Sequence, residues 1–301
     1  MIKLIKLIKI KIINFLNKIF AQKKILENQN ILKLNIGQIQ SKLNLDKKYK
    51  RINDYEFRIF SQFGEDGIIQ YLINNINISN KVFIEFGVEN YEEANTRFLL
   101  ENNNWSGLII DSSLNHINHI KEQNYYWRHD LKAVNSFITP DNINSIILNS
   151  NFKNKNIGLL SIDIDGNDYW VLKAINAVSP DILIVEYNAN FGLEKSLTIK
   201  YDKNFQRKKT GIGKLIYGCS IKAIVELCNK KNYSLVCTNS NGNNAFFIKN
   251  NLLNDKIQKR DIQEVFNINS FKEYLDKDNV NSKISDRQLA DLKNSDLLVE
   301  V

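Results

Sequence analysis

Acidic residues gather around one apolar segment near the middle of the chain. Residues 159–170 read L-L-S-I-D-I-D-G-N-D-Y-W, so Asp163, Asp165 and Asp168 lie within or just after an apolar run. Such runs are typical of strands buried in a parallel sheet, and ligands of open α/β sheets bind beyond the carboxyl ends of these strands. We therefore expect these acids to face a cation, a sulfonium group or an acidic proton. The alternative is that Asp168 caps the next helix while the other two acids are solvated.

A second group of acids follows two predicted strands in the first half of the chain. Residues 81–90 read K-V-F-I-E-F-G-V-E-N, which predicts a strand at 82–86 with Glu85 at its end and Gly87 in the following turn. Residues 105–111 read W-S-G-L-I-I-D and predict a strand that ends at Asp111. An acid at the end of the second strand of a β-α-β unit is placed to accept hydrogen bonds from a ribose diol.

The glycine content of the first turn separates two classes of nucleoside cofactor. Dinucleotide sites need G-x-G-x-x-G so that the backbone can approach a pyrophosphate. This turn has one glycine and then Glu89, which repels phosphate. S-adenosylmethionine has no phosphate and carries a sulfonium and an ammonium group, which carboxylates suit. The pattern therefore favours S-adenosylmethionine over the cofactor of a nicotinamide-dependent oxidoreductase.

The next predicted strand, at 182–186, ends at Glu186 and is followed by Tyr187 and Asn188. Because parallel neighbours end at the same edge of a sheet, this end is expected beside Asp163 and Asp165. Residues 190–218 then form a long polar segment that is rich in Lys and Arg. Long loops over such an edge are usually functional or disordered. The segment is either a lid that recognises an anionic group of a substrate or a solvated loop.

The alternation of strands and helices over residues 51–250 predicts one α/β domain. A hydrophobic content of 43% and a charged content of 25% are ordinary for a globular protein. Residues 233–238 and 245–249 flank Asn241-Gly242, a strong hairpin signal, so the last of seven strands is expected to be antiparallel. Capping boxes at Ser270/Glu273 and Ser285/Gln288 predict that residues 251–301 form a helical C-terminal extension of the same domain.

Residues 1–50 form a basic leader that differs in charge from the rest of the chain. They hold 12 Lys, no Arg and two acids, whereas the other 251 residues hold 29 basic and 31 acidic side chains. The basic character therefore belongs to the leader, which argues against a nucleic-acid partner, because such a partner requires a basic face on the folded domain. Within residues 1–20, lysines interrupt every apolar run that could span a bilayer. We expect a basic amphipathic helix on an anionic membrane surface, or else a helix packed against the body or a partner.

A short heptad stripe follows in residues 25–45. Its apolar members are spaced by seven, four, three and four residues, and they are Ile25, Leu32, Ile36, Ile39 and Leu43. This spacing predicts a helix that pairs with a second copy, giving a homo-oligomer, or a helix that acts as a spacer.

The three cysteines are nine residues apart and match no zinc or redox spacing. We expect reduced thiols in a cytoplasmic protein, held by its leader on the inner face of a membrane.

These motifs resemble those of the class I S-adenosylmethionine-dependent methyltransferases, and within them the FkbM-type enzymes, many of which occur in bacterial surface-polysaccharide gene sets. The resemblance covers about residues 60–250. It rests on S-Q-F-G-E-D-G (61–67), E-F-G-V-E-N, G-L-I-I-D, S-I-D-I-D-G-N-D-Y-W, I-V-E-Y-N and N-G-N-N-A-F-F-I-K (241–249). It implies a Rossmann-like seven-stranded sheet whose last strand is antiparallel. The first motif departs from the family pattern because it lacks the second and third glycine.

Matched residue by residue, the resemblance implies roles for single side chains. Glu85 and Gly87 match the first cofactor-binding motif, Asp111 matches the ribose-binding acid, and Asp163 matches the acid near the methyl group. The segment that lies over the cofactor in such proteins corresponds to Gln62, Glu65 and Asp66. Asp130, in a loop beside the predicted third strand, is included among the cofactor contacts.

A second similarity is to catechol O-methyltransferase-like enzymes, which hold Mg²⁺ with an Asp after the fourth strand and an acid-Asn pair after the fifth. The counterparts here are Asp163 or Asp165, then Glu186 and Asn188, although Tyr187 separates the last two. Carboxylate and amide oxygens are suitable Mg²⁺ ligands. This similarity leaves metal dependence open.

The expected function is methyl transfer to a sugar hydroxyl in the biosynthesis of a surface polysaccharide or glycoconjugate, with a sugar, nucleotide sugar or glycan as acceptor. Asp163 or Asp165 would take the proton of the hydroxyl as it attacks the methyl group. The alternative is a methyltransferase-like protein that has lost its chemistry and serves as a binding scaffold tethered by its leader.

Overall fold

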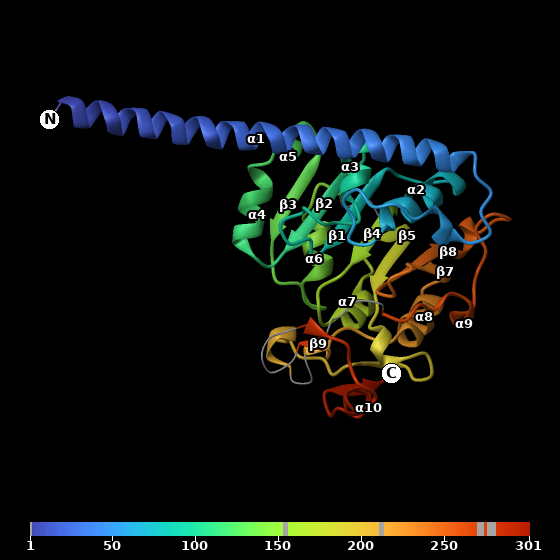
Figure 1. The fold of residues 1–301 in the computed structure, drawn as a ribbon. Coiled ribbons are helices and arrows are strands. Elements are labelled where there is room, and N and C mark those ends of the chain that lie inside the picture. The colour runs from blue at the N-terminus through green and yellow to red at the C-terminus, as the bar shows by residue number, and fades with distance from the viewer. Residues whose placement is uncertain (1, 153–155, 211–213, 270–273, 276–280) are drawn as a thin grey trace.

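A seven-stranded sheet forms the centre of the molecule (Figure 1). The computed structural model describes residues 2–152, 156–210, 214–269, 274–275 and 281–301. The strand order is β3-β2-β1-β4-β5-β8-β7. The strands are β1 (Val82–Phe86), β2 (Ser106–Asp111), β3 (Leu131–Asn135), β4 (Asn156–Ile162), β5 (Ser179–Glu186), β7 (Tyr233–Thr238) and β8 (Asn244–Lys249).

The direction of the strands confirms the predicted fold class. β8 is antiparallel to both of its neighbours, β5 and β7, whereas the pairs from β3 to β5 are parallel. The hairpin between β7 and β8 turns at Gly242, whose φ of +79° is a left-handed conformation that glycine adopts without strain. The last strand of the sheet in chain order is therefore the antiparallel one, as the Asn241-Gly242 signal predicted.

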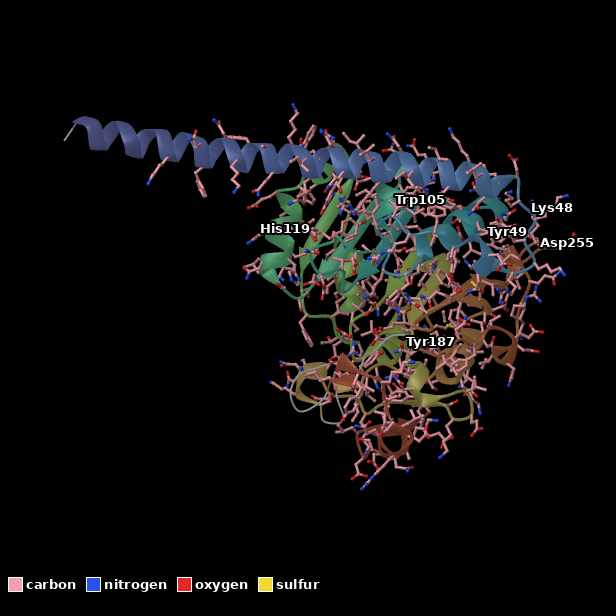
Figure 2. The ribbon with its side chains drawn as sticks, in the orientation of Figure 1. Lys48, Tyr49, Trp105, His119, Tyr187 and Asp255 are labelled. Carbon is pink, nitrogen blue, oxygen red and sulfur yellow. The ribbon has the colours of Figure 1, made fainter. Side chains whose placement is uncertain are left out.

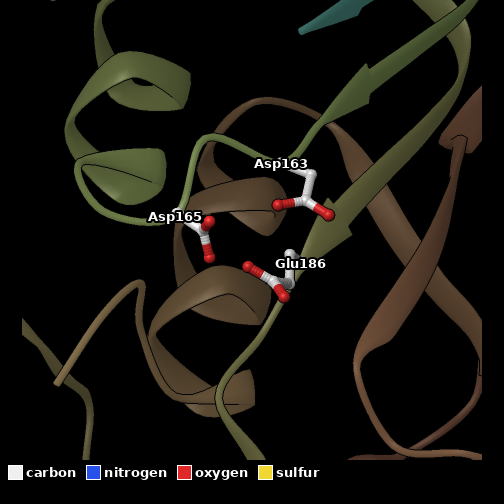
Figure 3. Close-up of side chains that lie close together, drawn as sticks. All are labelled: Asp163, Asp165 and Glu186. Carbon is white, nitrogen blue, oxygen red and sulfur yellow. The ribbon is translucent and has the colours of Figure 1, made fainter. Parts of the chain in front are cut away.

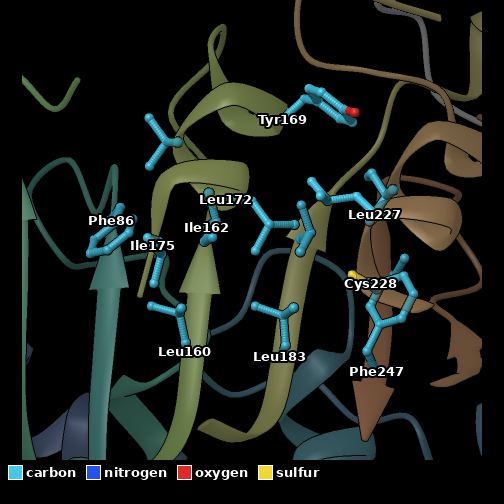
Figure 4. Packing of buried hydrophobic residues seen from close by; sticks show 14 of the residues in the cluster. Phe86, Leu160, Ile162, Tyr169, Leu172, Ile175, Leu183, Leu227, Cys228 and Phe247 are labelled. Atoms are coloured by element: carbon cyan, nitrogen blue, oxygen red, sulfur yellow. The ribbon is translucent and has the colours of Figure 1, made fainter. Parts of the chain in front are cut away.

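Helices cover both faces of the sheet. One face carries α2 (Glu65–Asn75), α3 (Arg97–Asn103), α4 (Leu114–Lys121) and α5 (Asn124–Arg128), and the other carries α6 (Ile143–Leu148), α7 (Asp168–Ala174) and α8 (Ile221–Lys230). Figure 4 shows Leu160, Ile162 and Leu183 in one cluster with Leu172 and Leu227. Because strand side chains alternate between faces, one continuous apolar run supplies both cores.

A single long helix, α1 (Ile2–Leu45), precedes the body and confirms the predicted N-terminal helix. Its second half lies against α2 and α3, and its first part extends beyond the body (Figure 1). A Cβ atom on Gly37 would lie 2.6 Å from the Phe98 ring and 2.8 Å from Ile59, so this glycine allows the close approach. Among the residues that the structure describes, we find no helix with the length and apolar content to cross a bilayer.

The segment between β5 and α8 is held by the C-terminal end of the chain. It contains η2 (Ala189–Phe191), the short strand β6 (Leu197–Ile199) and η3 (Arg207–Lys209), and β6 pairs antiparallel with β11 (Leu298–Glu300). Leu292 from α10 (Asp286–Lys293) and Leu298 share a small buried cluster with Leu197, Ile199 and Leu215. The C-terminal tail therefore packs against the segment that sequence analysis interpreted as either a lid or a solvated loop, called the lid below.

The C-terminal extension contains strands as well as the expected short helices. The capping box at Ser285/Gln288 is confirmed at the start of α10, whereas Ser270/Glu273 lies outside the described residues. The remaining elements are η1 (Ile52–Tyr55), η5 (Asn250–Leu252), α9 (Ile262–Val265), β9 (Tyr274–Leu275) and β10 (Asn281–Ser282).

Candidate active site

A cavity of about 1010 Å³ lies at the edge of the sheet where β1, β2, β4 and β5 end. The strand order places these four ends side by side. Seven carboxylates line the cavity together with Arg207 and His116, and they belong to Glu85, Glu89, Glu93, Asp111, Asp163, Asp165 and Glu186. Such an excess of acids favours a cationic ligand and disfavours a phosphate.

A second cavity of about 1040 Å³ lies beside the C-terminal end of α1. Lys48, Tyr49 and Asp255 are among its lining residues, and Figure 2 shows them together at that side of the molecule. None of the site residues predicted from the sequence lines it. The acidic cavity is therefore the candidate site.

Gly87 shapes the turn that follows β1. Its φ is +73°, and a Cβ atom there would lie 1.6 Å from the carbonyl oxygen of Asp163. Its amide donates a hydrogen bond of 2.9 Å to the carbonyl of Ile110 in β2. Both the backbone conformation and the close approach require glycine. The turn of β1 is thus packed directly against the loop that carries the central acids.

Glu85 lies at the end of β1 and is only 5% exposed. Its carboxylate accepts hydrogen bonds from the amides of Asn95 and Thr96, at 2.8 and 3.1 Å, and from the Thr96 hydroxyl at 2.5 Å. Burial raises the pKa of Glu85 to about 7, against the lowering effect of these hydrogen bonds. Glu85 therefore both lines the cavity and fixes the loop between β1 and α3.

Asp111 ends β2 and holds the two turns on either side of the cavity. One oxygen accepts from the amide of Glu89 at 2.9 Å, and the other accepts from the amide of Ser113 at 2.7 Å. His116 Nδ1 lies 3.2 Å from the second oxygen. Each carboxylate oxygen has more than one acceptor direction, so a ribose diol can still bind there.

Asp163, Asp165 and Glu186 converge at the ends of β4 and β5 (Figure 3). One carboxylate oxygen from each residue lies within 4.8 Å of the others. Asp163 is partly buried and Glu186 is 7% exposed, and Glu186 Oε2 has no hydrogen-bond partner among the described residues. The expected meeting of the two strand ends is observed, although Asp165 itself lies on the exposed side.

Burial raises the pKa of both Asp163 and Glu186 well above the ordinary carboxyl range. The charges of Asp165 and Asp168 raise the pKa of Asp163 further, and a hydrogen bond with Glu186 opposes this effect. Two neighbouring carboxyl groups disfavour each other's ionisation, which adds to the effect of burial on both pKa values. The pair is poised to accept or release a proton at a pH far above that of a free Asp.

Asp168 holds the loop that carries Asp163 and Asp165. Its carboxylate accepts from the amides of Ile164 and Gly166 at 2.8 and 2.9 Å, and the side chain is fully buried. Burial raises the pKa of Asp168 to about 6. Asp168 is therefore a structural acid, as the alternative interpretation supposed, but it does not cap the helix: it is the first residue of α7, whose N-cap is Asn167.

The predicted lid contributes Phe205, Gln206 and Arg207 to the cavity wall. Arg207 Nη1 lies 2.5 Å from Asp165 Oδ1, and its guanidinium carbon lies 3.7 Å from the ring centroid of Tyr217. Asp165 is 57% exposed on its side chain, and its φ is +55°. The sequence pattern indicated a basic segment near this edge but not the pairing of Arg207 with Asp165 or the position of His116 in the cavity wall.

The structure corrects the roles predicted for Glu65 and Asp66, because neither lines the cavity. Glu65 is fully buried and accepts from the side-chain amides of Asn239 and Asn244 at 2.7 and 2.9 Å. Asp66 Oδ2 accepts four hydrogen bonds, from the amides of residues 59, 60 and 61 and from the hydroxyl of residue 61. Both carboxylates therefore accept hydrogen bonds from other groups of the protein and do not face the cavity. Gln62, from the same motif, does line the cavity.

Two further predicted residues also lie away from the cavity. Asp130 is exposed and precedes β3, so it lies at the opposite edge of the sheet from the carboxyl ends. Asn188 is fully buried, and its side-chain amide donates to the carbonyls of Leu215 and Tyr217 at 2.8 and 3.2 Å. It therefore anchors the lid and cannot serve as a metal ligand in this conformation.

The acid cluster satisfies the elementary requirements of a site for a hard divalent cation. Its three carboxylates offer oxygen ligands at mutual distances compatible with one ion, and Glu186 supplies a buried oxygen without a partner. Asp165 replaces the predicted Asn188 in this set. The pairing of Asp165 with Arg207 competes with such an ion.

Comparisons with known proteins give similarity at the level of fold only. No family model matches the sequence, and no curated protein sequence matches it. Among solved structures, the chain is similar to a protein from Staphylococcus aureus that is described as a caffeoyl-CoA O-methyltransferase. The TM-score is 0.40, the identity is 13%, and the match covers 76% of this chain and 99% of that one. It is also similar to an O-methyltransferase from Bacillus cereus in complex with SAH, with a TM-score of 0.39, 15% identity and coverage of 72% and 89%. A third similar structure is M. capricolum TrmK with S-adenosyl-homocysteine, with a TM-score of 0.37, 13% identity and coverage of 69% and 76%.

Proposed function

We propose that this chain is an S-adenosylmethionine-dependent O-methyltransferase that acts on a sugar hydroxyl, of the FkbM type. The observation that carries the proposal is the single cavity at the ends of β1, β2, β4 and β5, with seven carboxylates in its wall. A sulfonium and an ammonium group suit this wall, whereas the pyrophosphate of a dinucleotide does not. Asp111 is placed for the ribose, and the turn at Gly87 lies between the ribose site and Asp163.

The reaction is an in-line displacement in which the acceptor oxygen forms a bond to the methyl carbon as the carbon–sulfur bond breaks. The sulfur keeps the electron pair of that bond, and the hydroxyl proton passes to a base. Asp163 is the base, because it is the acid of the cluster that is both partly buried and hydrogen-bonded to Glu186. General base catalysis contributes about 10²–10⁴-fold, and positioning of oxygen and methyl in line contributes roughly 7–11 kcal/mol.

The lid forms the acceptor side of the cavity. Phe205 packs so close to Gly166 that a Cβ atom there would lie 2.6 Å from its ring, and Arg207 lies over Tyr217. Polar and charged groups predominate in this wall, which suits a ligand with several hydroxyls. An acceptor that carries a phosphate or carboxylate would draw Arg207 away from Asp165. Nucleotide sugars and acidic glycans are therefore the first acceptors to test.

If the acid cluster holds Mg²⁺, the ligands would come from Asp163, Asp165 and Glu186. The ion would lower the pKa of the acceptor hydroxyl, and Asp163 would then bind metal instead of a proton. Turnover in the presence and absence of a chelator separates these two uses of the same side chains.

We also place the protein at the inner face of a membrane, through residues 1–20. The support is the charge of this segment, in which Lys residues are frequent and acids are absent. Sedimentation with anionic liposomes, with and without residues 1–20, tests this location. Equal sedimentation of the two forms would contradict it.

The decisive experiment for the proposed function has two stages. Calorimetry with S-adenosylmethionine should show binding to the wild-type chain and weaker binding to Asp111→Asn. Incubation with labelled cofactor and a panel of nucleotide sugars should then transfer label to the acceptor. Binding without transfer to any acceptor would support the scaffold alternative, and absence of binding would contradict both the cofactor and the site.

A further inference from the structure

The apolar stripe on α1 lies on the side of the helix that faces away from the body. The body contacts α1 through Leu34, Gly37, Ser41 and Asn44. At 100° per residue, these positions centre on the side opposite the stripe. The stripe consists of Ile25, Leu32, Ile36, Ile39 and Leu43, whose residues are 54–60% exposed. Apolar side chains in this arrangement are not explained by packing within the chain.

The spacing of the stripe is that of a seam between two helices. With Gln29 included, the positions follow one another at intervals of four, three, four, three and four residues, which is the a/d pattern of a coiled coil. The residues that contact the body occupy the b and f positions of the same heptads. The body therefore leaves the seam accessible along its whole length of about 27 Å.

The extent of exposed surface also favours a partner. The chain exposes 16425 Å² to solvent. A compact monomer of its mass, 35.0 kDa, exposes about 13,000 Å². A standard stable interface covers about 800 Å² of each partner. The difference between the observed area and that of a compact monomer is larger than the area that one partner of a standard interface covers.

We propose that a second copy of this chain occupies the stripe and that the two α1 helices pair in antiparallel orientation. The stripe is symmetric about residue 34, so antiparallel pairing brings Ile25 opposite Leu43 of the second copy and Leu32 opposite Ile36. The polar Gln29 then faces Ile39, and a single polar position of this kind helps to fix the register.

Charge decides between the two orientations. The same row continues toward the N-terminus through Gln22, Lys18, Phe15 and Lys11. In a parallel pair, Lys18 and Lys11 would each lie opposite the same lysine of the second copy, and these like charges would repel each other. In the antiparallel pair, both lysines lie beyond the end of the facing helix, which stops at Leu45, so they do not face their own copies.

Light scattering during size exclusion should give the wild-type chain a mass of twice 35.0 kDa. Ile36→Glu should give a monomer at the same concentration, because it places a charge at the centre of the seam. The matched control is Ile31→Glu, since Ile31 is 55% exposed on the same helix but lies off the stripe. This control should remain a dimer, and circular dichroism should show that both variants are folded.

Crosslinking tests the orientation. All three native cysteines are buried, so disulfide formation by introduced surface cysteines can be measured without interference from the native thiols. The double variant Ile25→Cys/Leu43→Cys should form a covalent dimer under mild oxidation, whereas Ile36→Cys alone should not. Efficient crosslinking by Ile36→Cys alone would overturn antiparallel pairing. A monomeric wild type that binds phosphatidylserine vesicles through the stripe, and loses this binding in Ile36→Glu, would overturn the second copy as the occupant.

Discussion

Two groups of carboxylates in this chain satisfy their hydrogen bonds in opposite ways. Asp66 and Asp168 are fully buried, and Asp66 Oδ2 and both oxygens of Asp168 accept hydrogen bonds mainly from backbone amides of their own loops, although Asp66 Oδ1 has no partner among the described residues. Asp163 and Glu186 instead lie at the ends of β4 and β5, where they are hydrogen-bonded to each other in the wall of the cavity. The first arrangement fixes a loop, and the second leaves proton-accepting capacity at a cavity wall.

The pKa of a carboxyl group does not by itself separate these two uses. Burial raises the pKa of Asp66 and of Asp168 to about 6, and it also raises the pKa of Asp163 and Glu186. The separating feature is the identity of the hydrogen-bond partners. Backbone amides satisfy a carboxylate and hold it in place, whereas a neighbouring carboxyl group keeps a proton exchangeable.

The largest effect that would sharpen this contrast is expected for Asp163→Asn. The amide keeps the shape of the side chain but cannot accept the hydroxyl proton, so turnover should fall about 10²–10⁴-fold, or roughly 3–5 kcal/mol in barrier height. Turnover at saturating cofactor measures this effect, and calorimetry should show nearly unchanged cofactor binding. Retained turnover with folded protein would mean that Asp163 is not the base.

Asp66→Ala should show the opposite profile. Four hydrogen bonds lose their acceptor, and buried amide donors are left unpaired, so the free energy of unfolding should fall by about 3 kcal/mol or more. Urea unfolding followed by circular dichroism measures this loss. Turnover per folded molecule should stay near the wild-type value at low temperature. A loss of turnover without a loss of stability would contradict the purely structural role of Asp66 and its separation from Asp163 and Glu186.

Asp111→Asn should produce an intermediate effect that is confined to binding. One ionised acceptor for the ribose is lost, which should raise the dissociation constant for S-adenosylmethionine about 10–100-fold. Titration calorimetry gives this value, and turnover at saturating cofactor should change little. Wild-type affinity in this variant would place the ribose elsewhere.

The smallest change is expected for Asp165→Asn, with turnover within about tenfold of wild type because Asp165 is exposed and paired with Arg207. Its charge raises the pKa of Asp163. A base is active only when deprotonated, so turnover should rise with pH through the raised pKa of Asp163. Removal of the Asp165 charge should move this rise to lower pH in a pH–rate profile. A loss of turnover as large as that of Asp163→Asn would instead make Asp165 the base.

Sequence patterns were sufficient to predict the sheet, and most of the candidate site residues lie together at one edge of it as expected. Continuous apolar runs that end in acids identify buried parallel strands, and the strand order then brings Glu85, Asp111, Asp163, Asp165 and Glu186 to one edge. Gly87 was predicted correctly as the turn residue, since its contact with the loop after β4 leaves no room for a side chain.

The errors arose where the direction of a side chain depends on its local loop. Glu65 and Asp66 have the same sequence signature as ligand-facing acids, but backbone amides and two asparagines surround them. Asn188 points at the lid because carbonyls of residues 215 and 217 accept its protons. Asp130 was misplaced because it directly precedes β3, which begins at Leu131. It therefore lies at the edge of the sheet opposite the carboxyl ends of the parallel strands.

The contact between Gly87 and the carbonyl of Asp163 has a kinetic consequence. The turn after β1 lies so close to that carbonyl that a Cβ atom at Gly87 would overlap it, so a shift of the turn toward the loop after β4 would displace the backbone of Asp163. A cofactor that binds against this turn and fixes its conformation would therefore also fix the position of Asp163. We therefore expect steady-state kinetics to show an ordered mechanism, in which S-adenosylmethionine binds first and the acceptor binds second.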